Sequence, residues 1–280
     1  MRSHRLTNAA GETYNLTGTN VIFHQTEGYG FEAENTFYRI GNRFIPIEKK
    51  KRQSSVTGKV IFYGESPYVQ YYDFARFVGD DNLVLRYSTE AGVFYKNVVL
   101  GKISKGEINK FECLECDIEF ISLTPWYKKV NITIKPNQEV EHLSTFPWRW
   151  PVHWSSENGM QIVVDSDSDI PSPCRLVING PIENPQWRHY VDGVYQSRGL
   201  IQWNVQKGES LVIDTLTDPY GIYLKTSDGT TQDLYQLSDF DMERFILLKK
   251  GRNVITVESR FVSDKKTTVK LEGQIYYDTV

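Results

Sequence analysis

Hydrophobic and polar residues alternate with a period of two along most of the chain, which is typical of strands with one buried face. The alternation is clearest at residues 83–87, 201–205 and 269–277. Asp192-Gly193 separates two further apolar runs, and this dipeptide suits a type I′ hairpin turn, whose two central residues both need a positive φ. The pattern therefore predicts a chain built mainly of strands and tight turns.

A single segment has the spacing of a helix, with apolar residues recurring every three or four positions from Tyr71 to Val78. Ser66 is a candidate N-cap, Pro67 suits the first helical turn, and Gly79 can end the helix. We therefore predict an all-β fold with one short helix, arranged as two β-sandwich domains.

The length of 280 residues favours two domains, each large enough to bury its own core. An aromatic and proline-rich segment at residues 146–151 favours an extended connector, because proline fixes φ and removes a backbone donor. The predicted division is an N-terminal β domain at 1–130, a connector at 131–152 and a C-terminal β-sandwich at 153–280.

Charge and aromatic content narrow the function classes. A net charge of −3 gives no support for a nucleic-acid surface, and 13% aromatic residues suit strands and protein interfaces. The basic run Lys49–Arg52 could contact phosphates, but beside Ile45-Pro46-Ile47 it is more typical of an exposed strand edge protected from aggregation. The N-terminus lacks the apolar run of a secretory signal, and no segment is apolar enough to span a bilayer, so we expect cytosolic synthesis.

The three cysteines do not form a convincing metal or disulfide site. Cys113 and Cys116 are three residues apart, so in a strand over residues 111–123 they point to opposite faces, and Cys174 stands alone. We expect three free structural thiols with no metal. The predicted core face of this strand consists of Leu114, Cys116, Ile118 and Phe120.

Other chemical motifs are incomplete or absent. The acidic run Asp165–Asp169 begins like a calcium loop, but Ile170 stands where glycine is needed and Leu176 where a bidentate glutamate is needed. We interpret it as a solvated turn. The sequence has no HExxH, GxSxG, P-loop or GxGxxG motif, so it predicts no catalytic residue, no metal site, no cofactor and no enzyme activity.

Aromatic residues of the second half suggest a carbohydrate surface. Exposed tryptophan and tyrosine rings on β-sandwiches can stack on the apolar faces of sugars. Trp187, Tyr190 and Tyr195 are the candidates for such stacking, and the alternative for Trp187 is burial in the core.

An ordered set of segments is more specific than any of these motifs. The set comprises residues 58–62, 66–79, 83–87, 94–99 and 120–127 in the first half, and 178–185, 208–215 and 245–255 in the second. In this order the segments resemble the distal tail proteins of long-tailed phages that infect Gram-positive bacteria, and the resemblance covers nearly the whole chain.

The resemblance implies a structural role at the phage tail tip, in a virion assembled in the host bacterial cytoplasm. Proteins of this family form a hexameric ring through their N-terminal domains, and DNA passes through the lumen without being read. The implied partners are further copies of the chain, the tail tube protein, the tip or lysin-bearing protein and, in some members, a receptor-binding protein. The C-terminal domain would be a galectin-like or carbohydrate-module-like jelly roll, and the family has no catalytic or cofactor residues to carry over.

Two alternatives stay open at the level of the sequence. A glycan-binding β-sandwich module would be a monomer that binds saccharide. A β-sandwich glycosidase would need a deep cleft with two close carboxylates.

Overall fold

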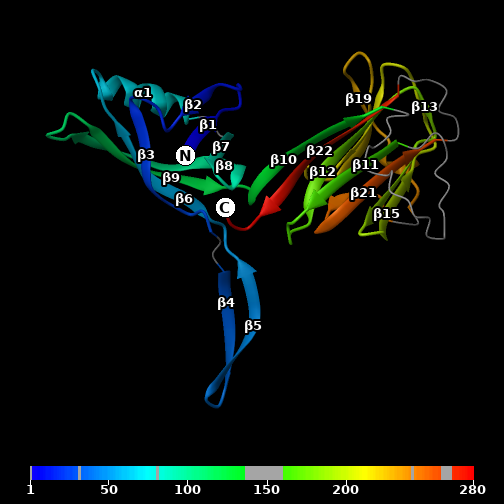
Figure 1. Ribbon diagram of the computed structural model, residues 1–280, viewed down its shortest axis with the longest axis horizontal. Coiled ribbons are helices and arrows are strands. Elements are labelled where there is room, and N and C mark those ends of the chain that lie inside the picture. Colours follow the sequence, from blue (N-terminus) through cyan, green and yellow to red (C-terminus); the bar gives the residue numbers. More distant parts are fainter. Residues whose placement is uncertain (1, 31–32, 80–81, 136–159, 241–242, 260–266) are drawn as a thin grey trace. The chain divides into compact units, whose positions relative to one another are not determined.

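The computed structural model describes residues 2–30, 33–79, 82–135, 160–240, 243–259 and 267–280, with all their side chains except those of residues 49 and 50. Most of these residues lie in β-strands (Figure 1). The described part of the chain has one α-helix, α1 (Pro67–Phe77), and one short 3-10 turn, η1 (Tyr235–Leu237). The predicted fold class, all-β with one short helix, is confirmed. No helix in these ranges has the length and hydrophobicity needed to cross a membrane.

The chain forms two compact units, the first from Met1–Lys128 with Tyr277–Val280 and the second from Lys129–Tyr276. The predicted first domain, 1–130, ends two residues later than the first unit's main segment and lacks its last four residues, and the predicted second domain, 153–280, starts later than the second unit. The last four residues belong to the first unit because the Tyr277 ring packs edge-on against Phe94, with centroids 5.6 Å apart.

The strand β10 (Trp126–Ile134) occupies the start of the predicted connector at 131–152, and residues 136–152 lie outside the described ranges.

The first unit has a sheet of antiparallel strands in the order β2-β1-β7-β8-β9-β6-β3, and β10 also pairs with β8 through Tyr127 and Tyr95. A separate hairpin consists of β4 (Ala33–Ile40) and β5 (Arg43–Lys51). The strands of the sheet are β1 (Ser3–Thr7), β2 (Thr13–Asn15), β3 (Val21–Glu27), β6 (Ser55–Phe62), β7 (Leu83–Thr89), β8 (Gly92–Ile108) and β9 (Leu114–Ser122).

The helix α1 covers part of this sheet with its apolar face. Phe74 is fully buried, and its ring centroid lies 5.6 Å from that of Phe62 and 5.0 Å from that of Tyr14. The predicted cap is wrong in one respect, because the Ser66 side chain makes no capping hydrogen bond. The Ser66 backbone carbonyl instead accepts hydrogen bonds from the amides of the first turn. The helix ends at Phe77, before Gly79.

The predicted core face of β9 is confirmed, since Leu114, Cys116, Ile118 and Phe120 are all buried. The strand begins at Leu114 and not at residue 111. Glu112 has a φ of 59°, a turn conformation that the strand pattern of the sequence does not reveal.

The second unit contains two larger sheets that each bury alternate residues. One has the order β19-β18-β17-β12-β22 with β20 on β12, the other has the order β11-β21-β14-β15, and β13 pairs with β16. The strands are β11 (Met160–Ser166), β12 (Ser172–Asn179), β13 (Ile182–Glu183), β14 (Gln186–Val191), β15 (Val194–Leu200), β16 (Asn204–Val205), β17 (Ser210–Asp214), β18 (Gly221–Lys225), β19 (Thr231–Asp233), β20 (Leu247–Leu248), β21 (Gly251–Glu258) and β22 (Thr268–Tyr277).

Two sequence predictions in this unit have different outcomes. Asp192 and Gly193 join β14 to β15 with φ values of 49° and 79°, as a type I′ turn requires. The continuous strand predicted at 201–205 is wrong, because Ile201 forms only an isolated bridge and regular pairing resumes at β16. Trp203, which lies between Ile201 and β16, is half-buried.

Candidate assembly surfaces

The hairpin β4–β5 is a two-stranded sheet of its own (Figure 1). Its register runs from Ala33 opposite Lys51 to Ile40 opposite Arg43, with a bulge after Thr36. Gly41 occupies the turn with a φ of 59°, a conformation that glycine adopts without strain. Local turn chemistry and strand-forming residues therefore account for this hairpin without help from neighbouring strands.

Large apolar side chains lie on both faces of this hairpin. Phe44 and Ile45 are consecutive and so point to opposite faces, yet both are exposed. Such concentrated apolar exposure is typical of an interaction surface. We name this set the hairpin surface; its members, 47% to 67% exposed, are Phe37, Tyr38, Ile40, Phe44, Ile45 and Ile47.

The chain entering β4 is held firmly at the foot of the hairpin. Gly28 has a φ of 90°, and a Cβ there would lie 1.9 Å from the Ser55 carbonyl oxygen. The next residue, Tyr29, stacks on Trp126 with centroids 5.7 Å apart, and its hydroxyl lies 2.7 Å from His4 Nε2. The foot is therefore fixed in the first unit's core.

An ion pair lies at the end of β5, where Lys51 Nζ is 2.6 Å from an Asp278 carboxylate oxygen. This ion pair links the end of the basic run to the C-terminal residues. The run thus lies at the end of β5 and just after it, and its members Lys51 and Arg52 are exposed.

His4 and Tyr29 have strongly shifted pKa values. Burial, followed by the nearby Arg2 charge, lowers the pKa of His4 to about 4, and burial raises the pKa of Tyr29 to about 12. Both groups are therefore neutral at pH 7. Their hydrogen bond is a neutral one, and it joins β1 to the chain entering the hairpin.

A second exposed apolar group surrounds α1. The Lys105 ammonium lies 4.7 Å from the centroid of the Tyr68 ring, and the Tyr68 hydroxyl donates to Glu107 Oε2 at 2.7 Å. These contacts place the end of β8 beside the helix. We name the exposed apolar side chains of the two segments the helix surface; they are Val69, Tyr72, Ile108 and Phe111.

The predicted carbohydrate residues are only partly available. Trp187 is fully buried, and its Nε1–H donates to the Arg244 carbonyl oxygen at 2.9 Å. The interpretation of Trp187 as a sugar-stacking residue is therefore wrong, because both ring faces are covered. Tyr190 is half-buried and Tyr195 exposed, and the two rings meet edge-on with centroids 5.8 Å apart.

The cysteines and the acidic run occupy structural positions. Cys174 is fully buried, which raises the pKa of its thiol to about 12, and Cys113 precedes β9 with its thiol donating to the Phe111 carbonyl. Asp169 at the end of the acidic run pairs with Lys250 at 2.7 Å in an exposed position. No group of three potential metal ligands occurs among the described residues.

Comparisons with solved structures find chains of the same fold. The chain is similar in structure to a chain of the phage P2 baseplate in its activated conformation with calcium, with a TM-score of 0.65, 16% identity and complete coverage of both chains. The same values hold for the phage P2 baseplate with strontium.

The Dit protein of phage SPP1, described as a paradigm of the hub adsorption apparatus of phages infecting Gram-positive bacteria, has a TM-score of 0.59 and 8% identity, with coverage of 96% of this chain and 98% of that one. At these identities the likeness shows a shared fold. None of the curated proteins matches the sequence.

The family assignment itself comes from the sequence profile described as distal tail protein, N-terminal domain, which matches residues 3–123. The matched range contains the sheet of the first unit, α1 and the hairpin surface. The predicted resemblance is thereby confirmed: residues 3–123 match the N-terminal domain of distal tail proteins, a family of structural phage-tail components.

Proposed function

We propose that this chain forms a hexameric ring at the distal end of a phage tail, with ring contacts made by the first unit. The ring joins the tail tube protein to the tip protein, and its lumen lets DNA pass. The observation that carries the proposal is the hairpin surface, six large apolar side chains on both faces of a two-stranded sheet. Its occupant in this proposal is the neighbouring copy of the chain.

The geometry of a closed ring supports this choice. Ring contacts are heterologous, so each copy must offer two different patches, one for each neighbour. The first unit has two separate apolar groups, the hairpin surface and the helix surface. Each contact can be weak, because closing the ring makes the last association intramolecular. Ring formation should therefore depend steeply on protein concentration.

The test compares the wild-type chain with a triple variant, Phe37→Ser, Phe44→Ser and Ile47→Ser. These side chains are exposed, so the variant should keep its fold while losing the apolar contact area. Mass measured by analytical ultracentrifugation over a concentration series, with and without the tail tube protein, should show hexamers for the wild type. The variant should stay monomeric at concentrations at least tenfold above the wild-type midpoint.

A matched control changes two exposed side chains of the hairpin β14–β15, with Val194→Ser and Tyr195→Ser. This control should assemble like the wild type. Assembly that survives the triple variant, or is lost in the control, would place the ring contacts elsewhere and contradict the proposal.

A carbohydrate role for the second unit is the second candidate, favoured by the exposed Tyr195 ring beside Tyr190. In this candidate function, wall polysaccharide of a host bacterium stacks on the Tyr195 side chain of the assembled hexamer. Calorimetric titration with that polysaccharide should give binding that Tyr195→Ala abolishes. Equal binding by the variant would exclude this surface.

A further inference from the structure

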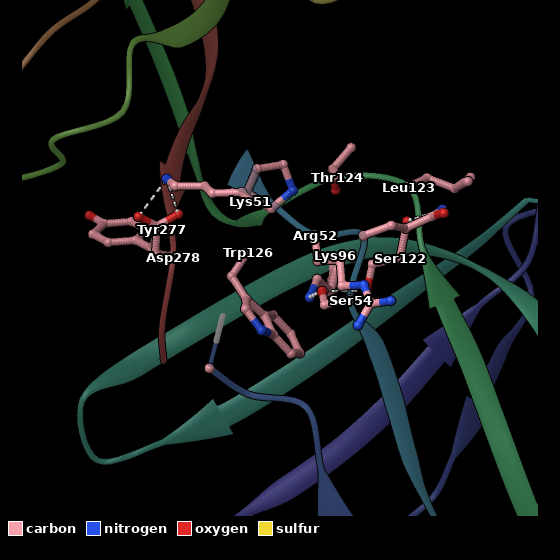
Figure 2. A pocket seen from close by; sticks show the side chains of 13 residues that line it. Lys51, Arg52, Ser54, Lys96, Ser122, Leu123, Thr124, Trp126, Tyr277 and Asp278 are labelled. Carbon is pink, nitrogen blue, oxygen red and sulfur yellow. Dashed lines mark hydrogen bonds and ion pairs between the residues drawn. The ribbon is translucent and has the colours of Figure 1, made fainter. Parts of the chain in front are cut away.

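A cavity of about 360 Å³ lies at the foot of the hairpin, within the first unit (Figure 2). Its wall includes the segment after β5, the end of β9, the start of β10 and the C-terminal residues. The charged residues that line it are Lys51, Arg52, Lys96 and Asp278. The volume exceeds that of several water molecules, at about 30 Å³ each, so a small ion with part of its hydration shell fits.

The Lys96 ammonium is unusually placed for a charged group. Its residue is only 2% exposed, and its Nζ donates to Ser54 Oγ at 3.0 Å. The same Nζ lies 5.0 Å from the centroid of the Trp126 ring. Among the described residues no carboxylate pairs with it, and burial lowers the pKa of Lys96 to about 8. Because an ammonium has three donors and one of them donates to Ser54, two N–H groups have no hydrogen-bond acceptor among the described residues.

The Trp126 indole adds a further unsatisfied donor. Its Nε1 is buried and has no hydrogen-bond acceptor in the part of the chain that the structure describes. Buried indole N–H groups normally find a partner, so an unpaired one in the wall of a cavity points to an acceptor that comes from outside the chain.

The net charge of the lining residues is positive. Asp278 already forms an ion pair with Lys51. The Lys51 Nζ atom lies 2.6 Å and 2.7 Å from the two carboxylate oxygens of Asp278. Three cations and one anion line the cavity, which gives 3 − 1 = +2. Figure 2 shows Lys96 and Ser54 together in this wall with the Arg52 side chain nearby. Burying a cation without a counter-charge is costly, and an anion in the cavity would remove that cost.

We propose that this cavity is an oxyanion site, in which the Lys96 ammonium and the Trp126 indole N–H donate to a phosphate or carboxylate group and Arg52 lies at its mouth. The oxyanion can be a free ion or a carboxylate carried by a neighbouring copy in the ring. The second source rests on the proposed function, whereas the first is independent of it. Ammonium, guanidinium and N–H donors of these kinds are the groups that bind oxyanions in proteins.

The first arm of the test uses the full chain at concentrations where it is monomeric. Calorimetric titration with inorganic phosphate and with acetate, at pH 7 and constant ionic strength, should show one saturable site. Lys96→Met should weaken binding at least tenfold, and Trp126→Phe, which keeps an aromatic ring but removes the N–H, should weaken it several-fold. Lys102→Met is the matched control, because Lys102 lies on the same strand and is exposed.

The second arm follows Lys96 itself in the wild-type chain, so it does not depend on a variant folding. The lysine side-chain carbon signals, titrated by NMR, report the pKa of Lys96. An anion in the cavity should raise that pKa from about 8 toward the ordinary lysine value. A rise on adding phosphate to the monomer identifies a free ion. A rise only on ring assembly identifies a carboxylate of the neighbouring copy.

The proposal is overturned if the pKa of Lys96 is the same in the monomer with phosphate, in the monomer with acetate and in the assembled ring. It is equally overturned if phosphate binds with the same affinity to wild type and Lys96→Met. A chain that binds phosphate but forms no ring contradicts the proposed function and leaves the oxyanion site in place.

Discussion

The hairpins β4–β5 and β14–β15 are built alike, but they differ in whether another strand pairs with them and in how far their apolar residues are buried. Each has two antiparallel strands and a turn containing a residue with positive φ. The strand β14 also pairs along its whole length with β21, and Trp187 and His189 on it are buried. The hairpin β4–β5 pairs with no other described strand, and its large apolar residues remain exposed.

The difference shows that local sequence decides whether a hairpin forms and that its neighbours decide what its apolar residues do. In β14 they belong to a core, where each contributes to the stability of one chain. In β4 and β5 they are available to another chain, so their free energy of burial should appear in assembly rather than in folding. Substitutions in the two hairpins should therefore separate these two quantities.

Trp187→Ala should have the largest effect on folding. The ring is fully buried against Gly199, where a Cβ would lie 2.0 Å from the Trp187 Cζ2 atom, and truncation also removes the donor to the Arg244 carbonyl. Loss of a buried aromatic side chain should lower the free energy of unfolding by about 3–5 kcal/mol. Urea denaturation of the second unit measures this, with Tyr195→Ala as control. A loss below about 1 kcal/mol would contradict the burial of Trp187.

Acid should loosen the foot of the exposed hairpin through His4. The pKa of His4 is about 4 in the folded chain and 6.5 for an unperturbed histidine, so between these values the unfolded chain binds a proton that the folded chain does not. Stability should therefore fall as pH drops from 6.5 to 4, by about 3 kcal/mol at most from this group. Unfolding of the wild type and His4→Gln should be compared at pH 7.5 and 4.5. Equal pH dependence in both would show that His4 is not the cause.

Lys51→Met should have a small effect on the monomer. The ion pair with Asp278 is short, but the Lys51 side chain is 55% exposed, and water screens such pairs. We expect a loss of at most about 1 kcal/mol in the free energy of unfolding, reduced further in 1 M salt. A loss well above this, independent of salt, would mean that the foot of the hairpin is held by this pair rather than by Tyr29 and His4.

The hairpin triple variant should change the monomer's stability little. Phe37, Phe44 and Ile47 are exposed in the folded chain, so replacing them by serine removes little buried area. Each substitution should change the free energy of unfolding by about 0.5 kcal/mol or less. Denaturation at a concentration below that of assembly measures this value. A large loss would show that the hairpin packs within its own chain and would remove the contrast with β14–β15.

Patterns along the chain predicted the fold class because side-chain alternation and turn chemistry are local. The core face of β9, the Asp192-Gly193 turn and α1 all follow from residues close in sequence. The Ser66 side chain was predicted to cap the helix, but a cap depends on a rotamer that spacing does not specify. Trp187 was ambiguous for a similar reason, because the same strand pattern fits a covered or an uncovered ring.

The features that carry the proposals were harder to predict. The sequence of β4 and β5 contains apolar residues that would also suit a core, and they form a surface because no other described strand pairs with the hairpin. The available signal was the basic run at the end of β5, which did indicate an exposed edge. Nothing in the sequence marks Lys96 as buried, since lysine is almost always exposed.

The sequence by itself determined the strands with alternating apolar residues, the one helix and the family of the N-terminal domain. These features depend on residue order and short-range geometry. The tertiary structure alone decided which alternating faces are covered. It brought Asp278 to Lys51 across 227 positions and set Lys96 beside Trp126. Burial and charge pairing arise between segments far apart in the chain, so no local pattern encodes them.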